Sequence, residues 1–185
     1  MENPLTEKLI DNIYRGLINS YKNSSTPVLS GYPHFKDFNI SAIDVCVKRP
    51  YTQLFGKVMY PTVLHKTAVI MHSLIKFHPF VDGNKRMALL SASCYLFWNG
   101  YIFDIPDDAD IFVKKCAENE VEYDIILDWL IKNTVKIRFS IFRTLLGRIF
   151  VTDDEKLLYM EMGFQRFFVH KIKNIRGKSN EHNTA

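Results

Sequence analysis

The sequence predicts an all-α fold with one short hairpin. Apolar residues recur at helical spacing in several separate stretches, and turn-forming residues separate these stretches from one another. Strand-like alternation is confined to one short segment. The chain has 185 residues, of which 47% are hydrophobic and 24% are charged. This is the size and composition of one domain with a sizeable core, and not of a disordered protein.

The first predicted helix covers residues 4–22, where apolar side chains return every three or four positions. Asn3 is the expected N-cap and Pro4 the expected first helical residue. Residues 23–34 are dense in Ser, Pro and Gly and predict a loop.

A short helix is expected over residues 40–47. It must stop near Arg49, because Pro50 disfavours helical geometry in the residue that precedes it. Residues 50–60 alternate loosely around Gly56, which indicates a hairpin or an extended flap.

Two strong helices follow. Pro61 is expected to open the first, which keeps a wide apolar face until the chain reaches His78. The second covers residues 84–98 and is closed by Asn99 and Gly100. Because this helix is apolar on nearly every side, it is predicted to be the central helix of the fold.

The remaining elements are also predicted to be helical. A helix ending near Cys116 follows three aspartates, whose charge favours a helix start. Another helix is expected over residues 123–132. Residues 135–150 and 153–173 are expected to form basic amphipathic helices.

The chain is therefore divided into four segments. These are an N-terminal helix and loop (residues 1–28), a core (29–135), a basic helical extension (136–173) and a disordered tail (174–185). The charge follows this division: Met1 to Ile131 carry 13 basic and 15 acidic residues, whereas Lys132 to Ala185 carry 11 and 5. The basic character thus belongs to the last third.

Several classes of protein are excluded. The longest apolar run, residues 87–98, is shorter than the roughly 20 residues that a membrane span needs. The N-terminus is acidic and lacks the pattern of a secretory signal. Three widely spaced cysteines indicate neither a disulfide framework nor a CxxC pair. A cytoplasmic protein without a membrane partner is expected.

One segment, His78 to Arg86 (HPFVDGNKR), carries the residue types of a catalytic site. It ends at the start of the predicted central helix, where backbone N–H groups favour an anion and Gly83 permits close approach of a phosphate. Lys85 and Arg86 add positive charge there. Asp82 offers an oxygen ligand that suits Mg²⁺ beside a phosphate. A histidine such as His78 can accept a proton from a hydroxyl at physiological pH.

This segment resembles the motif of the Fic/Doc family, H-x-F-x-[D/E]-[G/A]-N-[G/K]-R. The matching residues are His78, Phe80, Asp82, Gly83, Asn84, Lys85 and Arg86. The resemblance implies a Fic/Doc-like helical bundle with a flap near LFGKV. It implies that His78 is the general base, that Asp82 is catalytic and the Mg²⁺ ligand, and that Gly83, Asn84, Lys85 and Arg86 bind the phosphates of ATP or another nucleoside triphosphate. Pro79 and Phe80 would be structural.

Within the family, the motif with Lys at position 85 is most similar to that of the Doc (death-on-curing) toxins. AMP-transferring Fic enzymes typically have Gly at that position and a second Arg three residues after the first, where this chain has Leu89. The resemblance therefore implies a toxin that transfers a phosphoryl group to a Ser or Thr hydroxyl of a protein, with translation elongation factor Tu as the family's target. AMP transfer is the first alternative.

The same resemblance implies a separate Phd-like antitoxin, since no inhibitory [S/T]-x-x-x-E-[G/N] motif is present; four residues before Glu118 lies Lys114. The basic C-terminal segment is interpreted as added helices packed on the core. Binding of nucleic acid by this segment, docking of an acidic partner, and a non-enzymatic binding module are the alternatives. His65 and His72 lack carboxylate or Cys partners at ligand spacing and are expected to be ordinary helix residues.

Overall fold

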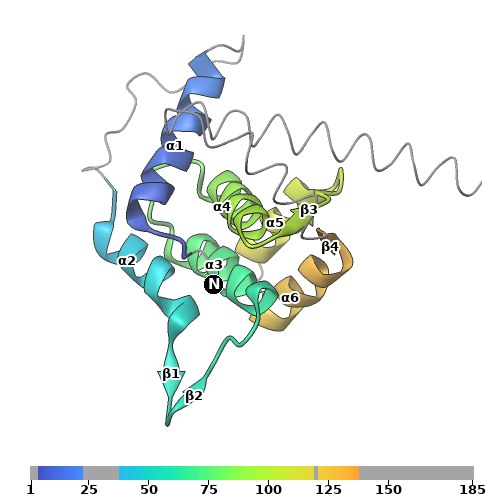
Figure 1. Cartoon of the computed structure of the whole chain (residues 1–185). Coiled ribbons are helices and arrows are strands. Elements are labelled where there is room, and N and C mark those ends of the chain that lie inside the picture. Colours follow the sequence, from blue (N-terminus) through green and yellow to red (C-terminus); the bar gives the residue numbers. More distant parts are fainter. Residues whose placement is uncertain (1–3, 23–37, 119–120, 138–185) are drawn as a thin grey trace, which may run out of the picture.

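The computed structural model describes residues 4–22, 38–118 and 121–137 of the chain. These residues form six α-helices, one 3₁₀ helix and two small antiparallel strand pairs (Figure 1). The elements are α1 (Glu7–Lys22), α2 (Ile40–Lys48), η2 (Arg49–Tyr51), β1 (Gln53–Leu54), β2 (Lys57–Val58), α3 (Val63–Phe77), α4 (Asn84–Trp98), β3 (Tyr101–Phe103), α5 (Ala109–Glu118), α6 (Tyr123–Lys132) and β4 (Thr134–Lys136). The predicted mostly helical fold is confirmed.

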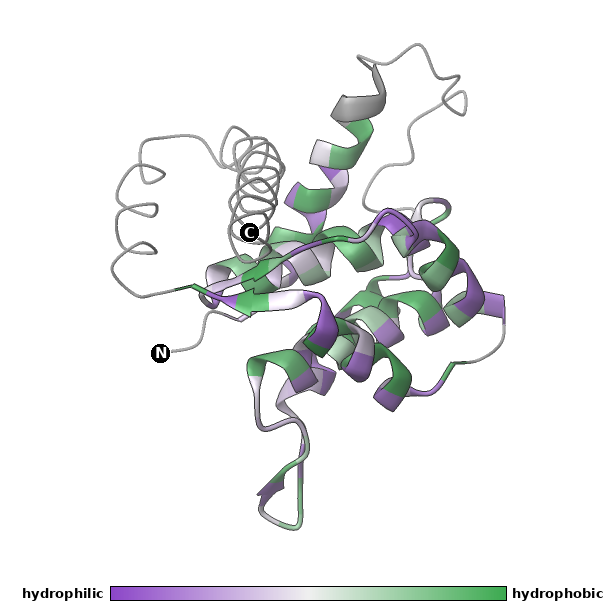
Figure 2. Cartoon of the chain, turned by 90° about the vertical axis from the view of Figure 1, so that its right-hand side faces the viewer, coloured by the Kyte–Doolittle hydropathy of each residue, from purple (hydrophilic) through white to green (hydrophobic). Residues whose placement is uncertain are grey.

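Helices α3 and α4 form the centre of the molecule and pack against each other (Figure 1). Helix α6 packs on α3, and α5 packs on α3 and α4. Helix α1 lies across α4 and α2. Most of α4 is buried, as its continuous apolar sequence predicted. The surrounding helices carry hydrophobic and hydrophilic stripes (Figure 2), because each buries only one face.

Two helix starts differ from their predicted positions. Helix α1 begins after Thr6, whose Oγ1 accepts the N–H of Leu9 at 3.2 Å, so Thr6 supplies a capping oxygen. The predicted N-cap, Asn3, lies outside the described residues. Pro4 therefore precedes the helix instead of opening it. In the same way, Thr62 caps α3 by accepting the N–H of His65, and Pro61 lies outside the helix. The hydroxyl oxygen of threonine accepts a hydrogen bond from a backbone N–H of the first turn, whereas proline has no side-chain acceptor.

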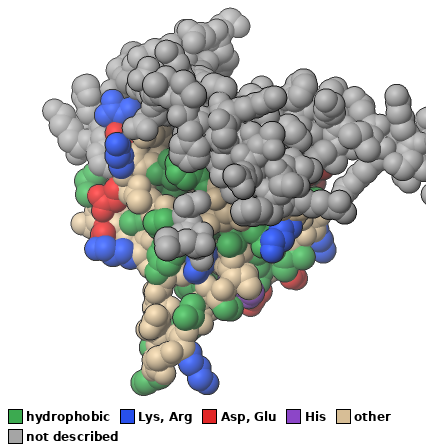
Figure 3. All heavy atoms as spheres, in the orientation of Figure 1, with side chains coloured by type: hydrophobic (Ala, Val, Ile, Leu, Met, Phe, Trp, Pro, Cys, Tyr) green, Lys and Arg blue, Asp and Glu red, His purple; other side chains and the backbone are tan. Residues whose placement is uncertain are grey.

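The segment after α2 forms the predicted hairpin. Helix α2 is capped by Asn39, whose side chain accepts the N–H of Ala42, and the chain passes through η2 at Pro50. Strands β1 and β2 pair antiparallel through the two-residue turn Phe55–Gly56, both with positive φ. The hairpin projects from the body of the molecule, with hydrophobic side chains at its end (Figure 3).

The strand pair β3–β4 was not predicted, and it corrects the prediction that a helix begins at residue 135. Tyr101 pairs with Lys136, and Ile137 N donates to Gly100 O at 2.8 Å. Asn133 ends α6 and allows the chain to turn back along β3. Three residues are too few for a period of two to be distinguished from a helical period, so only the pairing reveals the strand.

Other predictions meet the structure only in part. The three cysteines are free and buried. Within the described ranges, no helix is long and apolar enough to cross a membrane. The predicted loop over residues 23–34, the extension from residue 138 to 173 and the tail 174–185 lie outside the described residues. The division into four segments remains a prediction, and β4 runs one residue past the expected end of the core.

Candidate active site

His78 stands at the end of α3 in an unusual backbone conformation. Helix α3 stops at Phe77, because a residue before proline is disfavoured in right-handed helical geometry. His78 instead adopts the left-handed conformation, with φ 44° and ψ 56°. For a residue other than glycine this costs about 1–2 kcal/mol, so the surrounding structure must hold it. The result is an exposed imidazole at a fixed corner between α3 and the next loop.

The loop between His78 and α4 is held by a pair of reciprocal hydrogen bonds. Phe80 N donates to Asn84 Oδ1 at 2.9 Å, and Asn84 Nδ2 donates to Phe80 O at 2.7 Å. Asn39 N, at the start of α2, donates to Pro79 O at 2.9 Å. Because Asn84 is buried and both ends of its amide are engaged, its side chain supports the loop.

A cluster of three aromatic rings anchors the same loop to the core. Phe80 stacks on Tyr14 of α1 with a centroid distance of 5.1 Å, and Phe38 meets both rings edge-on. All three side chains are buried. The predicted structural role of Phe80 thus depends on partners that come from two other segments of the chain.

Gly83 starts α4 in the left-handed conformation, with φ 82°. Its N–H donates to Asp82 Oδ1 at 2.6 Å, and Met87 N makes a helical bond to Gly83 O. The first N–H groups of an α-helix have no acceptor within the helix, and they point outward from its N-terminal end. Lys85 is exposed in the same first turn, so the start of α4 presents backbone donors and positive charge together.

Asp82 and Arg86 form a surface pair beside this helix start. Arg86 Nη2 lies 3.9 Å from Asp82 Oδ2, and both side chains are about half exposed. Their charges also reach Tyr14: burial, and then the Asp82 carboxylate, raise the pKa of its phenol, whereas Arg86 opposes them. Tyr14 is therefore a buried neutral group directly beneath the charged loop.

Asp82 suits a metal ion that is shared with a ligand. Within residues 4–22, 38–118 and 121–137, no group of three or more His, Cys, Asp or Glu side chains gathers to hold a metal. The exposed Asp82 carboxylate has one oxygen on Gly83 N–H and retains further lone pairs. A single carboxylate beside a phosphate site fits Mg²⁺, which binds through one or two carboxylates and substrate phosphates.

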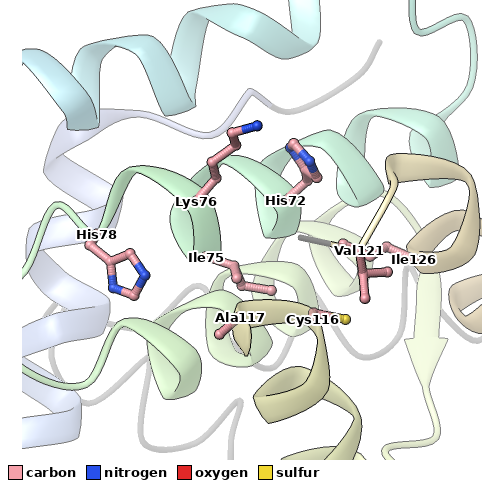
Figure 4. Close-up of a pocket in the computed structure, with 8 residues that line it drawn as sticks. All are labelled: His72, Ile75, Lys76, His78, Cys116, Ala117, Val121 and Ile126. Atoms are coloured by element: carbon pink, nitrogen blue, oxygen red, sulfur yellow. The ribbon is translucent and has the colours of Figure 1, made fainter. Parts of the chain in front are cut away.

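A cavity of about 230 Å³ opens beside His78 (Figure 4). The lining side chains come from α3 and His78 on one side and from α5, Val121 and α6 on the other. They are His72, Ile75, Lys76, His78, Cys116, Ala117, Val121 and Ile126. Most of these side chains are apolar, and the polar ones belong to α3 and the residue after it. The cavity is smaller than the usual 300–1,000 Å³ of a complete ligand site, so it suits one ring system.

The structure brings most of the predicted site residues together around the start of α4. His78 lies at the cavity, while Asp82, Gly83, Lys85 and Arg86 lie at the helix start. Leu89, one turn into α4, is partly buried against the core. Sequence reasoning missed the supporting residues of α1 and the cavity residues of α3 and α5. Their only signal is ordinary helical periodicity, which does not distinguish a cavity wall from a core.

Comparison with known proteins gives the same assignment. The model of the Fic/DOC family matches residues 4–96, about half of the chain. Toxin Doc of Mycolicibacterium smegmatis is 34% identical over 88 residues, which cover 45% of this chain and 67% of that protein. A Fido domain-containing protein of Dictyostelium discoideum is 42% identical over 43 residues, which are 23% of this chain and 30% of the relative. No solved structure matches the chain.

The helical fold and the loop from His78 to Arg86 thus define a Fic-type domain. The chain belongs to the Fic/Doc family. Members of this family are typically transferases.

Proposed function

We propose that this protein is a Doc-like toxin that transfers the γ-phosphoryl group of a nucleoside triphosphate to a Ser or Thr hydroxyl of a protein. The observation that carries the proposal is the short junction between α3 and α4, which has the exposed His78 at one end and the start of α4 at the other. Phosphoryl transfer depends mainly on positioning and on stabilisation of charge, and this junction would supply both.

In this reaction His78 accepts the proton of the attacking hydroxyl. The hydroxyl oxygen forms a bond to the γ-phosphorus, the bond from that phosphorus to the bridging oxygen breaks, and the nucleoside diphosphate leaves. The exposed position of His78 supports this role, because a protein side chain must approach it from solvent.

The phosphates would bind at the start of α4. Gly83, the N–H of Asn84 and the side chains of Lys85 and Arg86 would surround them, since backbone donors and cations there are complementary to an anion. Asp82 would hold Mg²⁺ against the phosphates. When bound, Mg²⁺ neutralises charge that develops on the phosphate oxygens.

Transfer of the γ-phosphoryl group is favoured over transfer of AMP by the environment of Leu89. This position carries no cation for an outer phosphate, and its side chain packs partly against the core. The Doc-like motif with Lys85 favours the same reaction. AMP transfer is the outcome that would contradict this part of the proposal.

The β1–β2 hairpin would receive the protein target. Both strands are exposed, and Phe55 at the turn is 96% exposed. Among the described residues each strand pairs only with the other, so the hairpin offers an outer strand edge and an apolar contact. An extended segment of a partner can add to such an edge. The name of the relative, Toxin Doc, supports a toxin with a separate antitoxin chain. Elongation factor Tu is the candidate target, and the cytoplasm the expected location.

The proposal is tested with ATP labelled at either the α or the γ phosphorus and with purified elongation factor Tu. We expect label on the target from γ-labelled ATP only. Replacing His78 with Ala should reduce the rate by about 10²–10⁴-fold, the contribution typical of a general base. His65→Ala is the matched control, because His65 lies on the same helix, is held by Thr62 and does not line the cavity.

Label on the target from α-labelled ATP alone would show that the protein transfers AMP and not the γ-phosphoryl group. Equal background transfer by wild type and His78→Ala, together with equal toxicity of the two in cells, would exclude the enzymatic function.

A further inference from the structure

The cavity beside His78 contains a second histidine that the proposed reaction does not use. His72 is half-buried on α3 and lines the cavity wall. Arg49 of η2 reaches this histidine: its Nη1 lies 3.2 Å from His72 Nδ1 and 3.1 Å from Ser73 Oγ. Ser73 is completely buried, so the guanidinium is held against α3 at two points.

This contact determines where the proton of His72 lies. A guanidinium only donates hydrogen bonds, so His72 Nδ1 must accept. The remaining ring nitrogen, Nε2, then carries the hydrogen, and the imidazole is neutral. Burial lowers the pKa of His72, and the positive charges of Arg49 and Lys76 lower it further, although Glu122 opposes them. His72 is thus a hydrogen-bond donor at neutral pH and not a base.

The other lining side chains do not compete with this donor for an acceptor. None of the eight lining residues carries a carboxylate or an amide. Lys76, one turn along α3, is exposed and turns its ammonium away from Ile75 and Ala117 (Figure 4). Apolar side chains, among them Ile75, Ala117 and Val121, line the rest of the cavity together with His78. Such a wall accepts a flat ring that presents hydrogen-bond acceptors, as the ring nitrogens and carbonyl oxygens of a nucleobase do.

We propose that His72 is the residue that recognises the nucleobase, and that Arg49 is a positioning residue that keeps His72 Nε2 protonated. This inference rests on the proposed function, since it assigns the base of the nucleoside triphosphate to this cavity. The phosphates bind elsewhere, at the start of α4. Recognition of the base and of the phosphates therefore depends on different residues.

The experiment compares the binding of ATP, GTP and inorganic tripolyphosphate to the full-length protein by isothermal titration calorimetry. Tripolyphosphate has the phosphates and no base. His72→Phe keeps a ring and removes the donor, so we expect ATP and GTP to bind roughly 5- to 10-fold more weakly, the effect of one hydrogen bond of about 1 kcal/mol. Tripolyphosphate should bind as it does to wild type. His72→Gln retains a donor and should recover most of the nucleotide affinity.

His65→Phe is the matched control. His65 is also on α3 but does not line the cavity, so none of the three affinities should change in this variant. Long-range ¹H–¹⁵N correlation spectra of the wild type at pH 7.5 should show His72 with hydrogen on Nε2. In Arg49→Met both tautomers should appear, and nucleotide affinity should fall while tripolyphosphate binding stays unchanged.

Two outcomes separate failure of this inference from failure of the proposed function. If wild type binds all three probes but His72→Phe weakens none of them, or weakens tripolyphosphate equally, His72 does not recognise the base. A His72 imidazole with hydrogen on Nδ1 would overturn the role of Arg49. If wild type binds no triphosphate at all, the proposed function fails, and this inference fails with it.

Discussion

Replacing Asn84 by alanine should destabilise the protein through one loop. The Asn84 amide donates to Phe80 O and accepts from Phe80 N, at 2.7 and 2.9 Å. Phe80 is buried, so the truncation leaves a backbone donor and a backbone acceptor away from water. Each unsatisfied group costs about 1–2 kcal/mol, which gives a total loss of roughly 2–4 kcal/mol.

Urea unfolding followed by circular dichroism measures this loss. With a slope of about 2 kcal/mol per molar urea, the midpoint should fall by roughly 1–2 M. Asn99→Ala is the matched control at the other end of α4. Asn99 Nδ2 donates to Tyr95 O at 2.8 Å in a half-buried setting, so the loss of this bond should cost about 1 kcal/mol. If the midpoint of Asn84→Ala stayed within error of wild type, the reciprocal bonds would not hold the loop.

Three further predictions concern the same region. Gly83→Ala and Gly100→Ala both place a side chain at φ 82°, with no new contact closer than 3.5 Å, so each variant should lose about 1–2 kcal/mol of stability. Only Gly83→Ala should weaken tripolyphosphate binding. Equal tripolyphosphate binding by the two variants would contradict a phosphate site at the start of α4. Burial and the Asp82 carboxylate raise the pKa of Tyr14 above 10.0, so Asp82→Asn should lower the midpoint of its ultraviolet titration, and an unchanged midpoint would show that the carboxylate does not act on the phenol. The pKa of His72 is lowered below 6.5 by burial and by Arg49 and Lys76, so the unfolded chain binds more protons at mildly acid pH. Stability should therefore fall as pH drops below about 6.5 and through the lowered pKa, and His72→Gln should remove this part of the pH dependence in urea titrations; a profile identical to wild type would refute it.

The predicted site residues are held in place by contacts with neighbours that the sequence did not reveal. Phe80 was expected to be structural, but its ring partners Tyr14 and Phe38 come from segments far away in the chain. Asn84 was expected to bind phosphate, whereas its side chain is engaged with the loop backbone. Periodicity identifies buried positions but does not say which of them meet, so these contacts required the tertiary structure.

One error in the prediction has a clear cause. The strand β4 was expected to be the start of a helix, because three residues carry too little periodicity to distinguish a strand from a helix. The contact between Arg49 and His72 was likewise not predicted, since the two residues lie 23 positions apart and nothing in the sequence joins them. Both features depend on long-range pairing.

The sequence by itself determined the helical fold class, the hairpin near Gly56, the central place of α4 and the family motif from His78 to Arg86. These features are local: they follow from apolar periodicity, turn residues and a contiguous motif. Tertiary structure alone decided how the motif loop is held, where the cavity opens and that Arg49 lies against His72. These features arise from contacts between segments far apart in the chain, and local preferences do not encode them.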